Sequence, residues 1–296
     1  MSDNRRRRET SDAIEETFSR YASEDRQPQL PTIESDEPTP QGKPSAPLKE
    51  QEKPGQPSHY PTNIPGLDDL LGGGLPNGGL IQIIGTIGSG YTTFINQILI
   101  NHLNNGGKAA YYTTETSSYN VQQEMAVYGW SLNRFIQNGN LVFINVLTPD
   151  LQQLAELAPE SFSKLRVTLS ESLTALKTDL LGKIKENRWA VLDLSHILHT
   201  YSLNEVVGLM MYWRATVRAF GGVGFAVLPS GVHDDKLVNA LKNIVDGVLE
   251  FGLREGTLEY GGSLIVQKLL GMRSAKRVSY SLREEGIIVE TAMRIR

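Results

Sequence analysis

The stretch that decides the fold runs from Gly79 to Gln97 and reads "GLIQIIGTIGSGYTTFINQ". An apolar run, Leu80–Ile84, leads into Gly85, and Gly90 follows after four further residues. Glycines let backbone N–H groups point into a turn, and the N-terminus of a following helix favours negative charge. An apolar strand, a glycine-rich turn and a helix in this order are typical of a phosphate-binding loop.

One position departs from that pattern. The residue after Gly90 is Tyr91, where such loops carry a lysine that places a cation at the β and γ phosphates. A hydrogen bond to a charged group is worth about 1.5–3 kcal/mol. Because about 1.4 kcal/mol corresponds to one decade, its loss is expected to weaken nucleotide binding roughly ten- to hundredfold. Hydrolysis is expected to suffer more, since the transferred phosphoryl group needs a cation.

The hydroxyl groups that follow the glycines are retained. Thr92 is placed to reach a magnesium ion on the phosphates, and Thr93 stands beside it. Two interpretations stay open: a loop that still binds nucleotide, and a tight strand-to-helix turn that glycines favour without any ligand. The predicted nucleotide-binding residues are Gly85, Gly88, Ser89, Gly90, Tyr91, Thr92 and Thr93.

Two carboxylates follow other predicted strands. "WAVLDLSH" places Asp193 at the end of an apolar strand, where it is expected to hold magnesium through the ion's water shell. "AAYYTTETS" places Glu115 just past the second strand, where a catalytic carboxylate would orient an attacking water. Carboxyl ends of parallel strands meet at one edge of a sheet, so both residues are expected near the loop. Capping of the next helix is the alternative role for each.

Short apolar segments alternate with longer stretches of helical spacing from Pro61 onward. This alternation predicts an α/β fold with a mostly parallel central sheet flanked by helices. A stripe of leucine and isoleucine marks the helix near 163–187 as core-facing. The predicted strands are Leu80–Ile84, Ala109–Tyr112, Leu141–Asn145, Ala190–Leu194, Gly224–Leu228 and Val248–Gly252, then antiparallel edge strands at Ser263–Leu269, Arg277–Leu282 and Gly286–Glu290, with helices near 92–104, 118–129, 163–187 and 203–219.

Residues 1–58 have a different composition. They hold eight of the 14 prolines and twelve acidic against nine basic residues. Such a segment buries too little apolar surface to offset its chain entropy, so a disordered N-terminal tail is predicted. A short helix near 12–22, capped by Asp12, is the exception; it is either without a role or a partner-binding helix that folds on contact.

Overall composition narrows the function classes. The 296-residue chain has no cysteine, which excludes disulfides and thiolate zinc sites. No run of eighteen apolar residues occurs, so no membrane insertion is expected, and we expect a cytoplasmic protein. The net charge of −4 disfavours nucleic acid as a partner.

The segment "TNIPGLDDLLGGGLPNGGLIQIIG" (Thr62–Gly85) closely resembles the opening segment of the RecA superfamily, in its KaiC, RadA and archaellum-ATPase branch. "IVDGVLEF" (Ile244–Phe251) resembles a late strand of that branch, and "GMR" (Gly271–Arg273) its intersubunit finger. The resemblance implies a RecA-like, KaiC-like P-loop domain over residues 59–296. It also implies ATP and Mg²⁺ between adjacent subunits of a homo-oligomer, often a ring, and suggests an archaeal origin.

Three positions depart from the family pattern. The loop lysine is Tyr91, and the two adjacent glutamates after the second strand read Glu115 and Thr116. The finger, usually lysine, any residue, arginine, reads Gly271–Arg273, which leaves Arg273 as the expected intersubunit contact. Three changes at positions that face phosphate or activate water indicate a degenerate Walker A motif and a relaxed demand for hydrolysis.

Three functions fit these observations. We expect a nucleotide-binding regulatory or assembly protein with weak or absent ATP hydrolysis, acting as a homo-oligomer or on a hetero-partner through the N-terminal tail. The alternative is a pseudoenzyme scaffold that binds no nucleotide and works through protein contacts. A recombinase-like DNA-binding paralogue ranks third, because the loop "PSGVHDDK" (Pro229–Lys236) carries two acidic residues and one lysine.

Overall fold

The computed structural model describes residues 58–114, 117–146, 172–253 and 261–290. Their central feature is a nine-stranded sheet whose middle strands are parallel and whose last three strands are antiparallel. This arrangement confirms the predicted fold class. In spatial order the sheet contains β11 (Gly286–Glu290), β10 (Lys276–Arg283), β9 (Gly261–Leu269), β8 (Gly247–Leu253), β3 (Gly79–Gly85), β7 (Val223–Pro229), β6 (Arg188–Asp193), β4 (Lys108–Thr113) and β5 (Leu141–Asn145).

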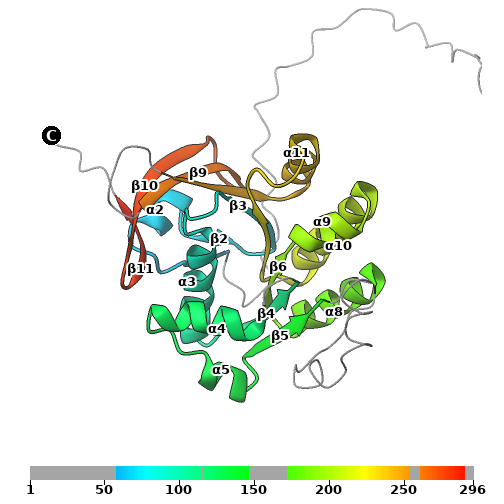
Figure 1. Cartoon of the computed structure of the whole chain (residues 1–296), viewed down its shortest axis with the longest axis horizontal. Coiled ribbons are helices and arrows are strands. Elements are labelled where there is room, and N and C mark those ends of the chain that lie inside the picture. The colour runs from blue at the N-terminus through cyan, green and yellow to red at the C-terminus, as the bar shows by residue number, and fades with distance from the viewer. Residues whose placement is uncertain (1–57, 115–116, 147–171, 254–260, 291–296) are drawn as a thin grey trace, which may run out of the picture. The chain divides into compact units, whose positions relative to one another are not determined.

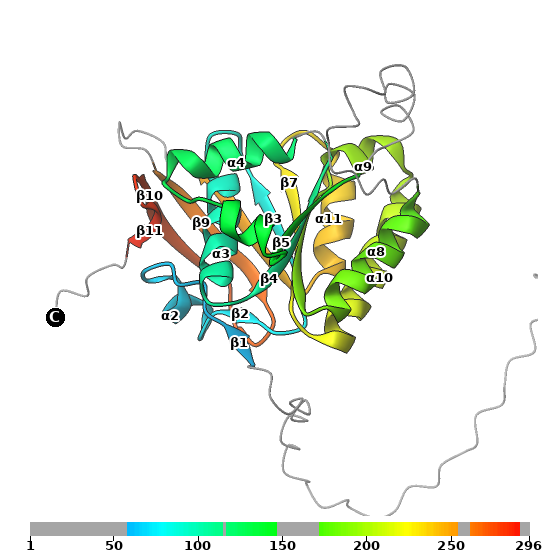
Figure 2. The ribbon, with the colours of Figure 1, turned by 90° about the horizontal axis from the view of Figure 1, so that it is seen from below.

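Helices cover both faces of this sheet (Figures 1 and 2). One face carries α2 (Leu67–Leu71), α3 (Tyr91–Asn104), α4 (Ser118–Val127) and α5 (Asn133–Gln137). The other carries α8 (Leu173–Lys185), α9 (Ser195–Thr200), α10 (Leu203–Phe220) and α11 (Asp235–Ile244). Two short strands, β1 (His59–Tyr60) and β2 (Leu75–Pro76), pair separately.

Strand β3 is the most enclosed part of the sheet. It pairs in parallel with β7 on one side and with β8 on the other, and all of its residues are buried. Ile81 and Ile83 pack into the core beneath α3, whereas Leu80 and Ile84 pack into the core beneath α10. A strand buried on both faces is mostly apolar on both, which explains the run in the sequence; buried Gln82 is the exception.

The segment before β3 is fixed by one carboxylate. Asp68 accepts hydrogen bonds from the backbone N–H of Thr62 at 2.8 Å, from its hydroxyl at 2.7 Å, and from the N–H of Asn63 at 3.1 Å. Gly74 lies at a φ of 116°, and a Cβ there would come within 2.2 Å of the carbonyl oxygen of Tyr60. The path of the backbone before β3 therefore requires the aspartate and the glycine at these two positions of the opening segment.

A second carboxylate, Asp246, joins β8 to β3. Its side chain is 1% exposed and accepts from the N–H of Leu80 at 3.1 Å, while its own N–H donates to the carbonyl oxygen of Leu80 at 2.8 Å. Arg214 and Arg218 of α10 reach the same carboxylate at 2.8 and 3.0 Å. The start of β8 is thus held in register with the start of β3.

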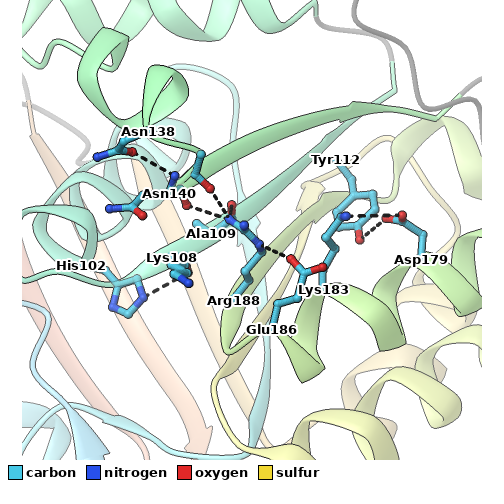
Figure 3. Close-up of polar contacts among 11 residues, drawn as sticks. His102, Lys108, Ala109, Tyr112, Asn138, Asn140, Asp179, Lys183, Glu186 and Arg188 are labelled. Atoms are coloured by element: carbon cyan, nitrogen blue, oxygen red, sulfur yellow. Dashed lines mark hydrogen bonds and ion pairs between the residues drawn. The ribbon is translucent and has the colours of Figure 1, made fainter.

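The outer strands are held by polar contacts that Figure 3 draws. Arg188 at the start of β6 donates to the carbonyl oxygens of Gly139 and Asn140 at 2.9 and 3.0 Å, and it pairs with Glu186 at 2.8 Å. Tyr112 of β4 donates to Asp179 of α8 at 2.7 Å. Burial and this carboxylate raise the pKa of the Tyr112 hydroxyl far above its usual range.

Most predicted elements are found, with three kinds of difference. The predicted helix near 163–187 is wrong at its start, because Ser172 is extended and caps a helix that begins at Leu173. Leu165 and Leu169 of its stripe, and the tail residues 1–57, lie outside the described residues. The short helices α2, α5, α9 and α11 were not predicted. No helix in the described ranges is long and apolar enough to span a membrane.

Asp246→Ala should lower the free energy of unfolding by about 2–3 kcal/mol, because the buried N–H of Leu80 and two guanidinium groups lose their acceptor. Urea denaturation monitored by circular dichroism measures the change. The matched control is Glu284→Ala, an exposed carboxylate in the β10–β11 turn, which should change stability by less than about 0.5 kcal/mol. Equal effects of the two substitutions would contradict the role of Asp246.

Candidate functional site

The loop between β3 and α3 has the backbone that phosphate binding requires. Gly88 and Gly90 have φ angles of 85° and 78°, in the left-handed region that favours glycine. Ser89 lies between them, fully buried, and its N–H donates to the carbonyl oxygen of Thr86 at 2.9 Å. These alternating conformations turn successive backbone N–H groups toward one side, which makes a concave anion-binding surface.

Neighbouring strands hold the loop in place. The N–H of Thr86 donates to the carbonyl oxygen of Phe251 in β8 at 3.0 Å, and the N–H of Ser230 donates to that of Gly85 at 2.8 Å. The buried hydroxyl of Tyr280, in β10, donates to the carbonyl oxygen of Ser89. Burial raises the pKa of Tyr280 to about 12. The shape of the loop is therefore set by the sheet around it, independently of residue 91.

Donors for an anion remain available. Within the described residues, no backbone acceptor is found for the N–H groups of Gly88 and Gly90. Helix α3 starts at Tyr91 with no side-chain cap, so the N–H groups of its first turn also lack an intrahelical partner. Together with the helix dipole these groups can hold phosphate oxygens.

Tyr91 occupies the place next to these donors without supplying a cation. A Cβ added to Gly85 would meet the ring atoms Cδ1 and Cγ of Tyr91 at 2.3 Å, so the ring packs directly over Gly85. The side chain is half-buried. Burial, and then the negative charges of Asp193 and Glu124, raise the pKa of its hydroxyl, which stays protonated and neutral at physiological pH.

A small cavity of about 60 Å³ opens beside the first turn of α3. Asp193 lies at its edge at the end of β6, and its Oδ1 accepts from the N–H and the hydroxyl of Ser195 at 2.8 and 2.7 Å. Asp193 precedes Leu194, the N-cap residue of α9, so this contact satisfies the first N–H of the helix from one position further upstream and orients the carboxylate. The polar side chains that line the cavity are Thr92, Tyr111, Tyr112, Thr113, Thr114, Glu124 and Asp193.

Sequence reasoning predicted only Thr92 and Asp193 of these seven residues and missed the other five, among them Glu124, Tyr111 and Thr114. Glu124 lies at an exposed position on α4, and partial desolvation of its carboxyl group raises the pKa of that group. Tyr111 lies on β4, and burial, Asp193 and Glu124 raise the pKa of its hydroxyl. Thr114 follows β4 and is buried. The one available signal was the position of Tyr111 and Thr114 around the end of a predicted strand; nothing in the sequence singles out Glu124.

The other predicted residues lie in different places. Thr92 lines the cavity, and the hydroxyl of Thr93 lies 3.3 Å from that of Tyr128. Glu115 is outside the described residues. Arg273 is exposed and lies in the turn between β9 and β10. Because β9 runs antiparallel to β8, this turn lies at the opposite end of the strands from the loop between β3 and α3. The length of a seven-residue strand, roughly 20 Å, therefore separates Arg273 from the loop of its own chain.

Nearby lysines are already in use. The Nζ of Lys276 donates to the carbonyl oxygen of Leu70 at 2.6 Å, in the last turn of α2. Lys268 lies 3.5 Å from the carbonyl oxygen of Asn243, and burial lowers its pKa. Neither contact places a cation in the cavity beside α3.

The comparison with known families agrees with this geometry. The family model described as "ATPase: KaiC" matches residues 60–293, most of the chain. The chain belongs to this family. Its mostly parallel sheet with antiparallel edge strands is accordingly that of a KaiC-like ATPase fold.

Individual relatives support the same assignment. A UPF0273 protein of Thermotoga maritima is 25% identical over 245 residues, covering 77% of this chain and 94% of the relative. A UPF0273 protein of Aeropyrum pernix is 26% identical with 77% and 92% covered. The circadian clock protein KaiC3 of Synechocystis is 34% identical over only 84 residues, 28% of this chain and 17% of that protein.

Among solved structures, a KaiC-like protein of Pyrococcus horikoshii superposes with a TM-score of 0.57 at 18% identity. The superposition covers 79% of this chain and 99% of the other. At this identity the likeness concerns the fold alone.

Gly85→Ala tests where the ring of Tyr91 lies. The new methyl group would collide with that ring, so stability should fall by about 2 kcal/mol. In a Tyr91→Gly background, which also removes the Cβ of residue 91 at 2.5 Å, the same change should cost less than about 0.5 kcal/mol, because Gly85 has no left-handed φ that needs glycine. Urea denaturation of wild type, both single variants and the double variant gives the coupling. Additive effects would show that the ring does not cover Gly85.

Proposed function

We propose that this KaiC-like protein binds ATP with Mg²⁺ in the loop between β3 and α3, hydrolyses it weakly or not at all, and acts as a nucleotide-binding regulatory or assembly protein. The observation that carries the proposal is the combination of an intact glycine backbone, with N–H donors at Gly88 and Gly90, and an uncharged residue at position 91. Binding depends mostly on the first feature and hydrolysis on the second.

Binding is supported by the way the loop is held. Backbone N–H groups and the α3 N-terminus contact phosphate oxygens without help from a lysine. When ATP is bound, the hydroxyl of Thr92 and the carboxylate of Asp193 are the groups that would hold Mg²⁺, and both line the cavity beside α3. Magnesium would supply the positive charge that shields the phosphates from the carboxylate of Asp193.

Weak hydrolysis follows from the charges around the site. Negative charge that develops on the transferred phosphoryl group must meet a positioned cation. No lysine or arginine lines the cavity in the part of the chain that is described. Arg283 follows Leu282, which contacts Gly90, but successive strand residues point to opposite faces, so its side chain is directed away from the loop.

Assembly is the second part of the proposal. Arg273 is exposed at the opposite end of the strands and cannot reach the β3–α3 loop of its own chain. The β3–α3 loop that it would contact is therefore that of a neighbouring copy. A head-to-tail contact of this kind closes into a ring when the rotation between copies allows it. The alternative is a hetero-partner that binds the N-terminal tail and responds to the bound nucleotide.

Tyr91→Lys should tighten binding of Mg²⁺–ATP by about tenfold or more, the worth of one charged hydrogen bond. Turnover should rise little until Gly271→Lys is added, although Gly271 has a φ of 88° and a lysine there costs roughly 1–2 kcal/mol of backbone strain. Calorimetric titration and phosphate release measure the two effects.

Tyr91→Phe is the matched control, because it keeps the ring and removes the hydroxyl; its ATP affinity should stay within about threefold of wild type. Robust phosphate release by the wild type would overturn the proposal of weak hydrolysis. No tightening in Tyr91→Lys would mean that the loop does not bind phosphate, and the scaffold function would then be preferred.

Arg273→Ala should weaken an ATP-dependent oligomer by at least about tenfold in dissociation constant, because one charged contact with phosphate is lost, and should leave the melting temperature unchanged. Arg277→Ala, an exposed arginine within β10, is the control and should have little effect. Light scattering with and without Mg²⁺–ATP reports the mass. The same mass under all conditions, in wild type and both variants, would count against a shared site.

A further inference from the structure

The cavity beside α3 holds a carboxylate that the proposed function has not used. Glu124 of α4 lines it together with Thr92 and Asp193, although α4 and β6 are far apart in sequence. Tyr111 also lines the cavity, and the negative charges of Glu124 and Asp193 raise the pKa of its hydroxyl group and of the hydroxyl group of Tyr91.

This arrangement has an unbalanced charge. Two carboxylates and only neutral hydroxyl groups line the cavity in the described residues, next to a loop whose donors suit phosphate. Carboxylates near a polyphosphate repel it unless a cation lies between them. The missing lysine at position 91 makes the imbalance larger.

An independent feature also points to a ligand in this cavity. Thr114 is nine-tenths buried and lines the cavity, and its Oγ1 has no hydrogen-bond partner among the residues that the structure describes. A buried hydroxyl without a partner costs free energy, so native proteins rarely keep one without a water or an ion to satisfy it. Adjacent Thr113, by contrast, donates its hydroxyl to Asn145.

We propose that Glu124 and Asp193 together hold, through water, a divalent cation that takes over the missing lysine's part in binding the phosphates, but not its part in hydrolysis. The polar groups at the cavity, Thr92 and Thr114, supply further oxygen partners of the kind that Mg²⁺ and its bound waters accept. This inference rests on the proposed nucleotide binding and makes that binding strictly dependent on a divalent cation.

The test is calorimetric titration of the full chain with ATP, once with excess Mg²⁺ and once with EDTA. Wild type should bind only when Mg²⁺ is present. Glu124→Gln should weaken binding roughly threefold to tenfold with Mg²⁺, and should make weak binding detectable in EDTA because one repulsive charge is gone. The matched control, Glu284→Gln, removes an exposed carboxylate outside the cavity and should change neither value.

A second readout uses Mn²⁺ in place of Mg²⁺. Electron paramagnetic resonance of free Mn²⁺, titrated with protein and ATP, should give a weaker Mn²⁺ affinity for Glu124→Gln and for Asp193→Asn than for wild type. Thermal melting of each variant confirms that it is folded.

The outcomes separate the two proposals. Wild type that binds no ATP in either condition overturns the proposed function itself, and this inference with it. Wild type that binds ATP while Glu124→Gln matches it in both conditions overturns the inference alone. Tighter binding by Glu124→Gln in both conditions also overturns it, because Glu124 would then only repel phosphate.

Discussion

The enclosure of β3 between β7 and β8 is the constraint on which the site depends. Every residue of β3 is buried, and Asp246 fixes where β8 starts relative to Leu80. The loop that leaves β3 then has little freedom, because Phe251, Ser230 and Tyr280 hold its backbone from neighbouring strands. A loop supported in this way keeps its shape when one of its side chains changes.

This support explains how a tyrosine can stand in the lysine position. The aromatic ring of Tyr91 packs over Gly85, where the absence of a Cβ leaves room for it. The substitution removes a charge but leaves the backbone donors untouched. Under the proposed function, binding and hydrolysis are therefore separable: the donors at Gly88 and Gly90 would serve the first, and a positioned cation would serve the second. In the absence of the lysine, the proposed divalent cation beside α3 would supply positive charge for binding.

The sequence predicted the sheet well and the site less completely. Buried parallel strands such as β3 and β7 are runs of mostly apolar residues, a signal that is local and strong. Short helices such as α9 were missed because one or two turns carry too little periodicity, and Asp193 was the only sign of it. The start of α8 at Leu173 was missed because a leucine stripe does not reveal a cap.

Long-range placement was beyond the sequence. Glu124 enters the site only because α4 lies against the first turn of α3, and no motif marks it. Arg273 was predicted as an intersubunit contact. Its position at the opposite end of the strands follows from the antiparallel pairing of β8 and β9, whose register could not be predicted from the sequence. Glu115 stays a prediction, since it lies outside the described residues.

The most direct test of the central claim is a nuclear magnetic resonance titration of the wild-type protein with Mg²⁺–ATP, following the backbone amide signals of the loop. If the glycine backbone holds phosphate, the amide signals of Gly88 and Gly90 should shift saturably, with half of the change between micromolar and millimolar ATP. If those two signals stay in place at millimolar Mg²⁺–ATP, the loop is a structural turn and the account is wrong.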